Sequence, residues 1–276
     1  MAQRKTTPVP TDLDAYPHTQ QQRLQQFLDT LRRRGRADTT IRKRQSCLLR
    51  FLHYLYTAHI PRLQDVRTTD LDRLRKHLLD HAYSQHTIYA TLVSIRLFYT
   101  WLADTGHLFE NPAADLVTAK PRLRLGLVLD RDQVHRLLQQ PDLTRPLGLR
   151  DRAIIELLYA TGIRIGECTA LTVPDLDLSN QTLSVTGKGR KQRLLPMGKH
   201  AAAHCQQYLQ RARPKLLRDH PPPDALWLGH RRARPITPAR IRQLLKTHAA
   251  AAQLPPETDT HTLRRTCATH MLQHGA

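Results

Sequence analysis

The sequence predicts a mostly α-helical protein with a small β-sheet, organised as two domains. A chain of 276 residues is longer than one core usually organises in a helix-rich protein. Hydrophobic residues make up 40% of it and recur at helical spacing through most of its length, which is enough to bury a core. Only the stretch around residues 183–196 changes to the alternation typical of a β-hairpin. We therefore expect a helical bundle followed by a mixed, mostly helical domain.

The first domain is predicted over residues 17–115, after a flexible polar arm at 1–16. Four apolar stripes at helical spacing indicate four helices, and their short connections favour a small bundle. The stripes begin at Leu24, after the N-cap signal Asp38-Thr39-Thr40, at Thr69 and near Ser84. Asn111-Pro112 ends the helical region. The aperiodic, basic stretch 116–129 is typical of an interdomain linker.

The second domain is predicted over residues 130–276. Asp130 and Gln133 form a capping-box pattern, and a helix at about 148–160 is broken by Thr161-Gly162. Alternation at Leu183 and Val185, a glycine-rich turn and a second run predict the hairpin. The remaining expected elements are helices at about 199–212, from Thr237-Pro238 and from near Thr260, and a short apolar piece at 225–228.

The charge balance points to nucleic acid as the partner. Lysine and arginine total 43 against 23 acidic residues, a formal charge of +20. A globular chain this basic repels itself unless an anionic partner neutralises it. The first domain concentrates basic residues between positions 32 and 50, and we expect Arg42, Lys43 and Arg44 to contact the DNA backbone. The alternative for this cluster is a solvated helix face.

Cysteine usage and hydropathy exclude other classes of protein. Cys47, Cys168, Cys205 and Cys267 are scattered without a Cys-x-x-Cys pair, which argues against a zinc ribbon or a disulfide framework and fits a reducing cytoplasm. No apolar run is long enough to span a bilayer, so no membrane partner is expected. His200 and His204 with adjacent Cys205 could hold zinc, but the spacing matches no metal motif and favours a solvated helix face. No metal or cofactor is expected.

Three segments of the second domain place basic side chains at structural breaks. Arg164 follows the helix-ending Gly162 and opens the next helix, where an arginine can hold a phosphate through two parallel hydrogen bonds. Gly187-Lys188-Gly189 pushes Lys188 outward on a hairpin tip, and Arg190 and Lys191 suit a backbone clamp there. His261 and Arg264 share one helix face, an arrangement that suits a phosphate carrying developing negative charge. Taken singly, each segment has a bland surface or structural alternative.

Together, in this order, the segments resemble the tyrosine recombinase (phage integrase) family, particularly its Xer-like members. The resemblance is carried by Ala160-Thr161-Gly162-Ile163-Arg164 with Glu167, by Gly187-Lys188-Gly189 with Arg193-Leu194-Leu195-Pro196, and by His261-Thr262-Leu263-Arg264 with Ala268-Thr269-His270. It implies an N-terminal SAM-like core-binding bundle and a mixed α/β catalytic domain that together clamp duplex DNA.

The resemblance also implies roles for four residues and a reaction. Arg164 and Arg264 would bind the non-bridging oxygens of the scissile phosphate, Lys188 would protonate the leaving 5′-oxygen, and His261 would assist proton transfer at the nucleophile. Strand cleavage and rejoining would proceed through a 3′-phosphotyrosyl intermediate. Arginines would neutralise the phosphate charge where other enzymes use metals. Members act as tetramers on two DNA sites, so a homo-oligomer is implied.

The sequence departs from the family pattern at two places. The first is that the family's Gly-His turn and nucleophilic tyrosine are not present. On the family's spacing they should follow Ala276 by roughly ten and twenty residues, since helix boundaries fix such positions only approximately. We therefore expect the chain to bind DNA without cleaving it, either as it stands or as a fragment of an active recombinase. Arg265 occupies a position where Xer-like members often carry histidine.

Two other functions stay open from the sequence. A non-catalytic DNA-binding regulator or accessory protein on the same fold would keep the basic surfaces but would not depend on Arg164 or Lys188. An RNA- or ribosome-binding protein would bind RNA and duplex DNA equally, but it would leave the three ordered motifs without an explanation.

Overall fold

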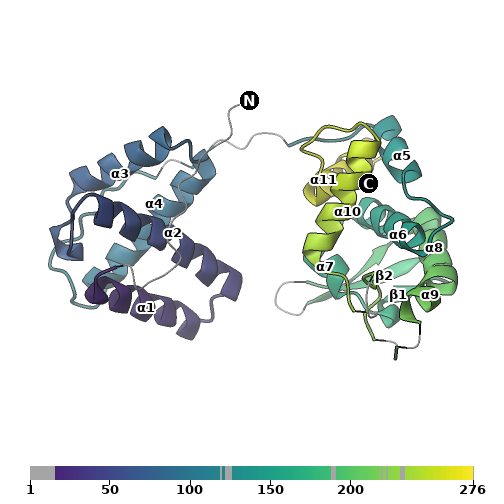
Figure 1. Ribbon diagram of the computed structural model, residues 1–276, viewed down its shortest axis with the longest axis horizontal. Coiled ribbons are helices and arrows are strands. Elements are labelled where there is room, and N and C mark those ends of the chain that lie inside the picture. Colours follow the sequence, from purple (N-terminus) through teal and green to yellow (C-terminus); the bar gives the residue numbers. More distant parts are fainter. Residues whose placement is uncertain are drawn as a thin grey trace. The chain divides into compact units, whose positions relative to one another are not determined.

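The structure, a computed structural model, describes residues 16–118, 120–121, 126–187, 191–218, 220–221, 223–230 and 234–275. The chain divides into two compact units, Met1–Leu123 and Arg124–Ala276, which are considered one at a time (Figure 1). The predicted class, mostly helical with a small sheet, is confirmed. The predictions for the arm up to residue 15, for Lys188 and for Arg190 lie outside the described residues.

The first unit is built from α1 (His18–Arg33), α2 (Asp38–Thr57), α3 (Thr68–Asp80) and α4 (Gln85–Asp104). The helix α2 packs against α1 and α4, so it is central to the bundle. The Ser84 hydroxyl caps α4 by accepting a hydrogen bond from the Thr87 N–H at 3.1 Å, as the sequence predicts. The cap expected at Asp38 is one residue off. Asp38 is already helical, and the cap position is held by Ala37, without a side-chain cap.

Aromatic rings fill the core of this unit. Phe27 of α1 meets Phe98 of α4 with ring centroids 5.3 Å apart, and Trp101 lies 5.7 Å from Phe27. The fully buried Tyr99 donates its hydroxyl to the Leu63 carbonyl at 3.0 Å, and burial raises the pKa of that hydroxyl. Tyr16, which the sequence assigned to the end of the flexible arm, is 4% exposed and belongs to this core. Burying the large ring of Tyr16 against the apolar core is favourable, and the polar, proline-rich pattern around it gave no sign of that contact.

The second unit contains most of the elements. Its helices are α5 (Arg131–Gln139), α6 (Pro146–Thr161), α7 (Ile165–Ala170), α8 (Gly198–Gln207), α9 (Arg213–Leu217), α10 (Pro238–Ala251) and α11 (Thr260–Gln273). The helix α6 packs against α8 and α11 and provides much of the core. Predicted caps hold, since the Asp130 carboxylate accepts from the Gln133 N–H at 2.7 Å and Thr237 caps α10.

The sheet has three antiparallel strands rather than the predicted two. Strand β2 (Thr182–Thr186) pairs with β3 (Gln192–Pro196) as the hairpin, and β1 (Leu176–Asp177) adds to the other side of β2. Leu183 and Val185 of β2 are fully buried, as their alternation predicts. The strand β1 was missed because two residues are too few to show an alternation.

The helix predicted at 199–212 is interrupted. It ends as α8 at Gln207, continues as a π-helical turn over Tyr208–Ala212, and resumes as α9. Pro214 accounts for the interruption, because proline has no N–H to donate and its ring clashes with the carbonyl four residues earlier.

Both ends of the predicted linker are packed. Leu116 is buried in the core of the first unit, and Leu129 is buried in the core of the second. The chain between the two cores is therefore shorter than the predicted stretch 116–129.

Candidate active site

Arg164 is held at the junction between α6 and α7. Gly162 ends α6 with a φ of +59°, a left-handed conformation that glycine adopts at little cost. Arg164 follows Gly162 by two residues. The Glu167 carboxylate accepts hydrogen bonds from the Arg164 backbone N–H at 2.8 Å and from the Arg164 Nη1 at 3.1 Å. The Arg164 side chain stays 60% exposed, so the guanidinium is held at one edge and open to a ligand on the other.

Arg264 joins α11 to the same junction. The Asp259 carboxylate caps α11 by accepting from the Thr262 N–H at 2.7 Å, which sets where the helix begins. Arg264 is half-buried and donates from Nη1 to the Gly162 carbonyl, two residues from Arg164. His261 is exposed on α11, three residues before Arg264. The two predicted phosphate-binding arginines thus belong to one cluster.

The base of the hairpin is tied to this cluster by an ion pair. Arg193 of β3 donates to the Glu167 carboxylate from Nη2 at 2.8 Å and from Nη1 at 3.1 Å. Gly187, at the end of β2, lies so close that an added Cβ would be 3.1 Å from Arg193 Nη1 and 3.9 Å from Glu167 Oε1. The Gly187 N–H donates to the Lys191 carbonyl at 2.8 Å. Gly187, which precedes Lys188, therefore lies next to Glu167, and the exposed Lys191 is joined to Gly187 by this backbone hydrogen bond.

Glu167 stays ionised because its arginine partners outweigh its burial. Its side chain is only 8% exposed, which by itself raises the carboxyl pKa, but hydrogen bonds from Arg193 and Arg164 lower the pKa to about 2. The sequence assigned Glu167 and Arg193 no role. Glu167 stands at the third position of a helix, where acidic residues commonly cap, so a signal for it existed. Its pairing with Arg193, 26 residues away, had no local signal.

The predicted DNA-binding residues of the first unit lie on α2. Arg42 and Lys43 are exposed, whereas Arg44 is half-buried. Arg44 donates from Nη1 to the hydroxyl of the buried Ser94 on α4 at 2.9 Å. Arg44 therefore also fastens α2 to α4, a structural task that the charge pattern did not reveal.

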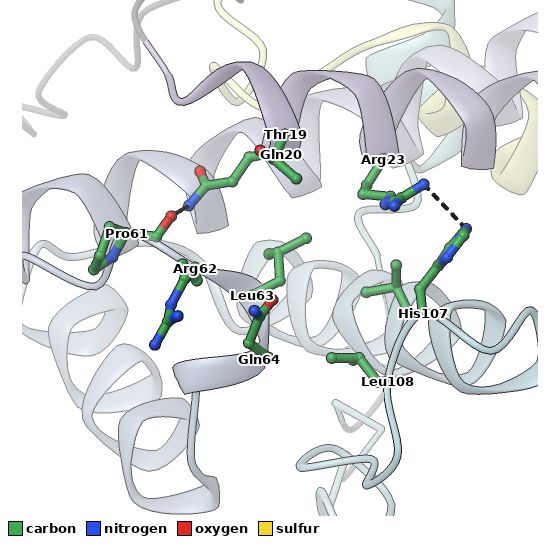
Figure 2. Close-up of a pocket in the computed structure, with 10 residues that line it drawn as sticks. Thr19, Gln20, Arg23, Pro61, Arg62, Leu63, Gln64, His107 and Leu108 are labelled. Atoms are coloured by element: carbon green, nitrogen blue, oxygen red, sulfur yellow. Dashed lines mark hydrogen bonds between the residues drawn. The ribbon is translucent and has the colours of Figure 1, made fainter.

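The first unit also contains a hollow near the start of α1 and the end of α4 (Figure 2). Figure 2 shows Arg23 extending from α1 to His107, where Nη1 lies 3.2 Å from the ring Nε2. An arginine can only donate, so this contact requires neutral His107. Burial first, and then the Arg23 charge, lower the pKa of His107. None of the predicted site residues lines this hollow.

The tyrosines of the second unit are Tyr159 and Tyr208. The Tyr159 hydroxyl lies 2.9 Å from His270 Nδ1, and burial raises its pKa. Tyr208 is fully buried, donates to the Leu226 carbonyl at 2.9 Å and accepts from the Leu228 N–H at 3.1 Å. Burial raises the pKa of Tyr208 to about 12. The hydrogen bonds of both hydroxyls are therefore made to residues other than Arg164, Glu167, Arg193 and Arg264.

Within the described residues, no three His, Cys, Asp or Glu side chains are placed to hold a metal ion. His200 is exposed while Cys205 is buried, and His204 Nε2 lies 3.8 Å from Glu156 Oε1. The helices of the described ranges also include none that is both long and apolar enough to cross a membrane.

Comparisons with known proteins agree with this architecture. Residues 128–276 match the phage integrase family, and residues 24–106 match the phage integrase N-terminal SAM-like domain. The tyrosine recombinase XerD of Shewanella oneidensis is 34% identical over 251 residues, which are 91% of this chain and 83% of that protein. XerD of Listeria innocua is 33% identical over 244 residues, or 88% of this chain and 82% of that one.

Solved structures share the fold at lower identity. A lambda integrase dimer bound to a COC′ core site superposes with a TM-score of 0.74 and 17% identity, covering 92% of this chain and 90% of that one. The XerH recombinase bound to a palindromic difH substrate gives 0.71 and 17%, covering 95% and 82%. These structures share the helical bundle followed by a helical domain with a small sheet, and the family models and relatives assign the chain to the recombinases of the integrase class. The chain belongs to the phage integrase family of tyrosine recombinases.

Proposed function

We propose that this chain binds duplex DNA at a recombination site and that each copy holds one phosphate of its half-site between Arg164 and Arg264. The observation that carries the proposal is the Gly162–Glu167 junction, which Arg264 contacts from α11 and Arg193 from β3. Two arginines with donors to spare can neutralise a phosphate and orient it for in-line attack. The XerD relatives are tyrosine recombinases, and the XerH and lambda integrase neighbours are described as bound to their DNA sites.

Lys188 and His261 complete the proposed site. Lys188 would protonate the leaving 5′-oxygen, and His261 would assist proton transfer at the nucleophile. Their support is placement: Gly187, which precedes Lys188, lies beside Glu167, and His261 is exposed one turn before Arg264.

The strand-cleaving step of the family needs a tyrosine nucleophile. Tyr159 is hydrogen-bonded to His270 and Tyr208 is buried, so we propose that neither forms a covalent link to DNA. A nicked suicide substrate should therefore give no covalent adduct with this chain. An adduct mapped to any tyrosine of the chain would contradict this part of the proposal.

The phosphate-binding proposal can be tested on a DNA site that the chain itself selects. The site is first selected from random duplexes bound by the chain, and each of its phosphates is then replaced in turn by a neutral methylphosphonate. For the unmodified chain, one position in each half-site should lose about 10- to 150-fold in affinity, the effect of losing hydrogen bonds to a charged group. In Arg164→Ala and in Arg264→Ala, the loss of affinity at that position should be smaller, and in the double variant it should disappear.

The matched control is Arg242→Ala, which removes an exposed arginine of α10 and the same charge. Arg242→Ala should lower the affinity for DNA, but the phosphate that depends on Arg164 should remain sensitive to methylphosphonate replacement. A scan in which no phosphate depends on Arg164 or Arg264 would overturn the proposed site. Equal affinity for RNA would instead favour the RNA-binding alternative.

We further propose that the chain assembles with copies of itself on DNA. One structural neighbour is described as a lambda integrase tetramer bound to a Holliday junction. Native mass measurement of the chain with its selected duplex should show two copies on a site with two half-sites, and one copy at saturation would refute the assembly.

A further inference from the structure

Arg265 stands next to Arg264, the proposed phosphate ligand, on α11, but its contacts point to another partner. Its Nε donates to the Leu127 carbonyl at 3.1 Å, and its Nη2 lies 3.4 Å from the Thr262 hydroxyl. Leu127 belongs to the stretch that the sequence assigned to the linker. The guanidinium therefore connects α11 to the chain arriving from the first unit.

Gly126 makes this contact possible. A Cβ added to Gly126 would lie 2.2 Å from both Cζ and Nη1 of Arg265 and 2.6 Å from its Nε. These distances are far shorter than any van der Waals contact, so the guanidinium occupies the space that a side chain would need. A residue larger than glycine at 126 can be accommodated only if Arg265 moves away.

A second tie follows at the next residue of α11. The Thr266 hydroxyl accepts the Leu129 backbone N–H at 3.0 Å, and Leu129 is fully buried. This tie is part of the core, whereas the Arg265 tie lies at the surface. Leu127 also packs against the core of the second unit, so Arg265 holds the backbone of a residue whose side chain is already partly buried.

We propose that Arg265 is the anchor of the interdomain segment: it holds Gly126 and Leu127 against α11, so that the chain from the first unit is fastened to the same helix that carries His261 and Arg264. Its Nε and Nη2 are engaged by the protein itself, which separates its task from the phosphate binding proposed for its neighbour. The inference goes beyond the proposed DNA binding and does not depend on it.

Limited trypsin digestion tests the anchor without DNA. Lys120 precedes proline and resists trypsin, which leaves the bonds after Arg122 and Arg124 in this stretch. Cleavage after Arg124 requires Gly126 and Leu127 to enter the protease as the second and third residues beyond the bond. They must leave Arg265 to do so. For cleavage after Arg122, Gly126 is only the fourth residue beyond the bond, so Gly126 and Leu127 have much less need to leave Arg265.

The expected result is a change at one bond. In Arg265→Ala, cleavage after Arg124 should rise about three- to tenfold relative to cleavage after Arg122, the effect of one lost hydrogen bond on an opening equilibrium. Intact-mass analysis of the fragments identifies each bond. Arg242→Ala, which removes an exposed arginine from α10, serves as the matched control and should leave the ratio unchanged.

A double-mutant cycle ties the effect to Gly126. Gly126→Ala should raise cleavage after Arg124 as Arg265→Ala does, because the new Cβ displaces the guanidinium. In the Arg265→Ala background, Gly126→Ala should add nothing, since the group that it displaces is already gone. Additive effects of the two substitutions, or an unchanged cleavage ratio in Arg265→Ala, would overturn the proposal.

DNA affinity separates the anchor from a phosphate contact. Even complete release of residues 126–128, against the packing of Leu127 on the core, would lengthen the stretch between Leu116 and the second core only from nine residues (117–125) to twelve (117–128). Such a change lowers the effective concentration of one unit at the other by about 1.5-fold. Affinity in Arg265→Ala should therefore stay within about twofold, with the same salt dependence. A salt slope smaller by about one would show a lost phosphate contact and overturn the anchor.

Discussion

Glu167→Gln should change both the stability of the second unit and its dependence on pH. The pKa of Glu167 falls from its ordinary value of 4.5 to about 2 because Arg193 and Arg164 donate to the carboxylate, against the opposing effect of burial. A difference of this size between folded and unfolded chain corresponds to stabilisation on the order of 3 kcal/mol at pH 7. The amide keeps the shape but loses the charge, and its NH2 group cannot accept from an arginine.

The sign follows from the lowered pKa. The contribution is complete above the ordinary pKa of 4.5 and is lost as the pH falls toward 2, because protons then bind the unfolded chain more readily than the folded one. About 2 kcal/mol of it should be gone by pH 3. The gap in stability between the unmodified chain and Glu167→Gln should therefore narrow between pH 7 and pH 3.

Urea unfolding followed by the fluorescence of the buried Trp227 measures this gap. The chain has two tryptophans, so a Trp101→Phe background leaves Trp227 as the only reporter, and it lies in the second unit. Glu257→Gln, a change at an exposed glutamate of the same unit, is the control and should follow the unmodified chain. A gap that is the same at pH 3 as at pH 7 would show that Glu167 does not titrate as described.

Three further substitutions test the packing around the site and the core. Gly162→Ala should cost about 1–2 kcal/mol in a urea melt, because φ is +59° and the new Cβ would lie 3.2 Å from Cys267 Sγ; Gly166→Ala, with nothing within 4 Å, should cost nothing. Arg150→Leu should lower the free energy of unfolding by about 3–5 kcal/mol, since the fully buried guanidinium donates to Asp151 and to the Leu228 carbonyl. The control, Arg145→Leu, removes an exposed arginine and should leave the free energy of unfolding unchanged. Tyr99→Phe should cost about 1–3 kcal/mol, measured by Trp101 emission, because the Leu63 carbonyl loses its donor; no change would mean that water replaces the hydroxyl.

The helices could be predicted because their signals are local. The caps at Ser84, Asp130 and Thr237 lie within three residues of the amides that they satisfy, and the apolar stripes repeat within each helix. The failures also have local causes. The two-residue strand β1 carries no period, and the π-helical turn before Pro214 needs a backbone geometry that the apolar pattern of 199–212 does not reveal.

The candidate site residues could be proposed from the sequence by type and order, but their contacts could not. Arg164, Lys188, His261 and Arg264 stand in segments whose wording and order resemble one family, so the sequence alone was sufficient to identify the family. The pairing of Arg193 with Glu167, and the contact of Arg264 with the Gly162 carbonyl, join residues 26 and 102 positions apart. No local pattern encodes such distances, because they follow from how the helices and the sheet pack.

The sequence by itself thus determined the class of fold, the basic charge that favours DNA, and the candidate phosphate-binding residues. The tertiary structure alone decided which cations are available and which are engaged within the protein. Arg44, Arg193 and Arg265 donate to Ser94, Glu167 and Leu127. Arg164 also pairs with Glu167, but its side chain stays 60% exposed. The physical reason is that an arginine's charge belongs to its residue type, whereas the partner that its guanidinium meets is set by the packing of distant segments.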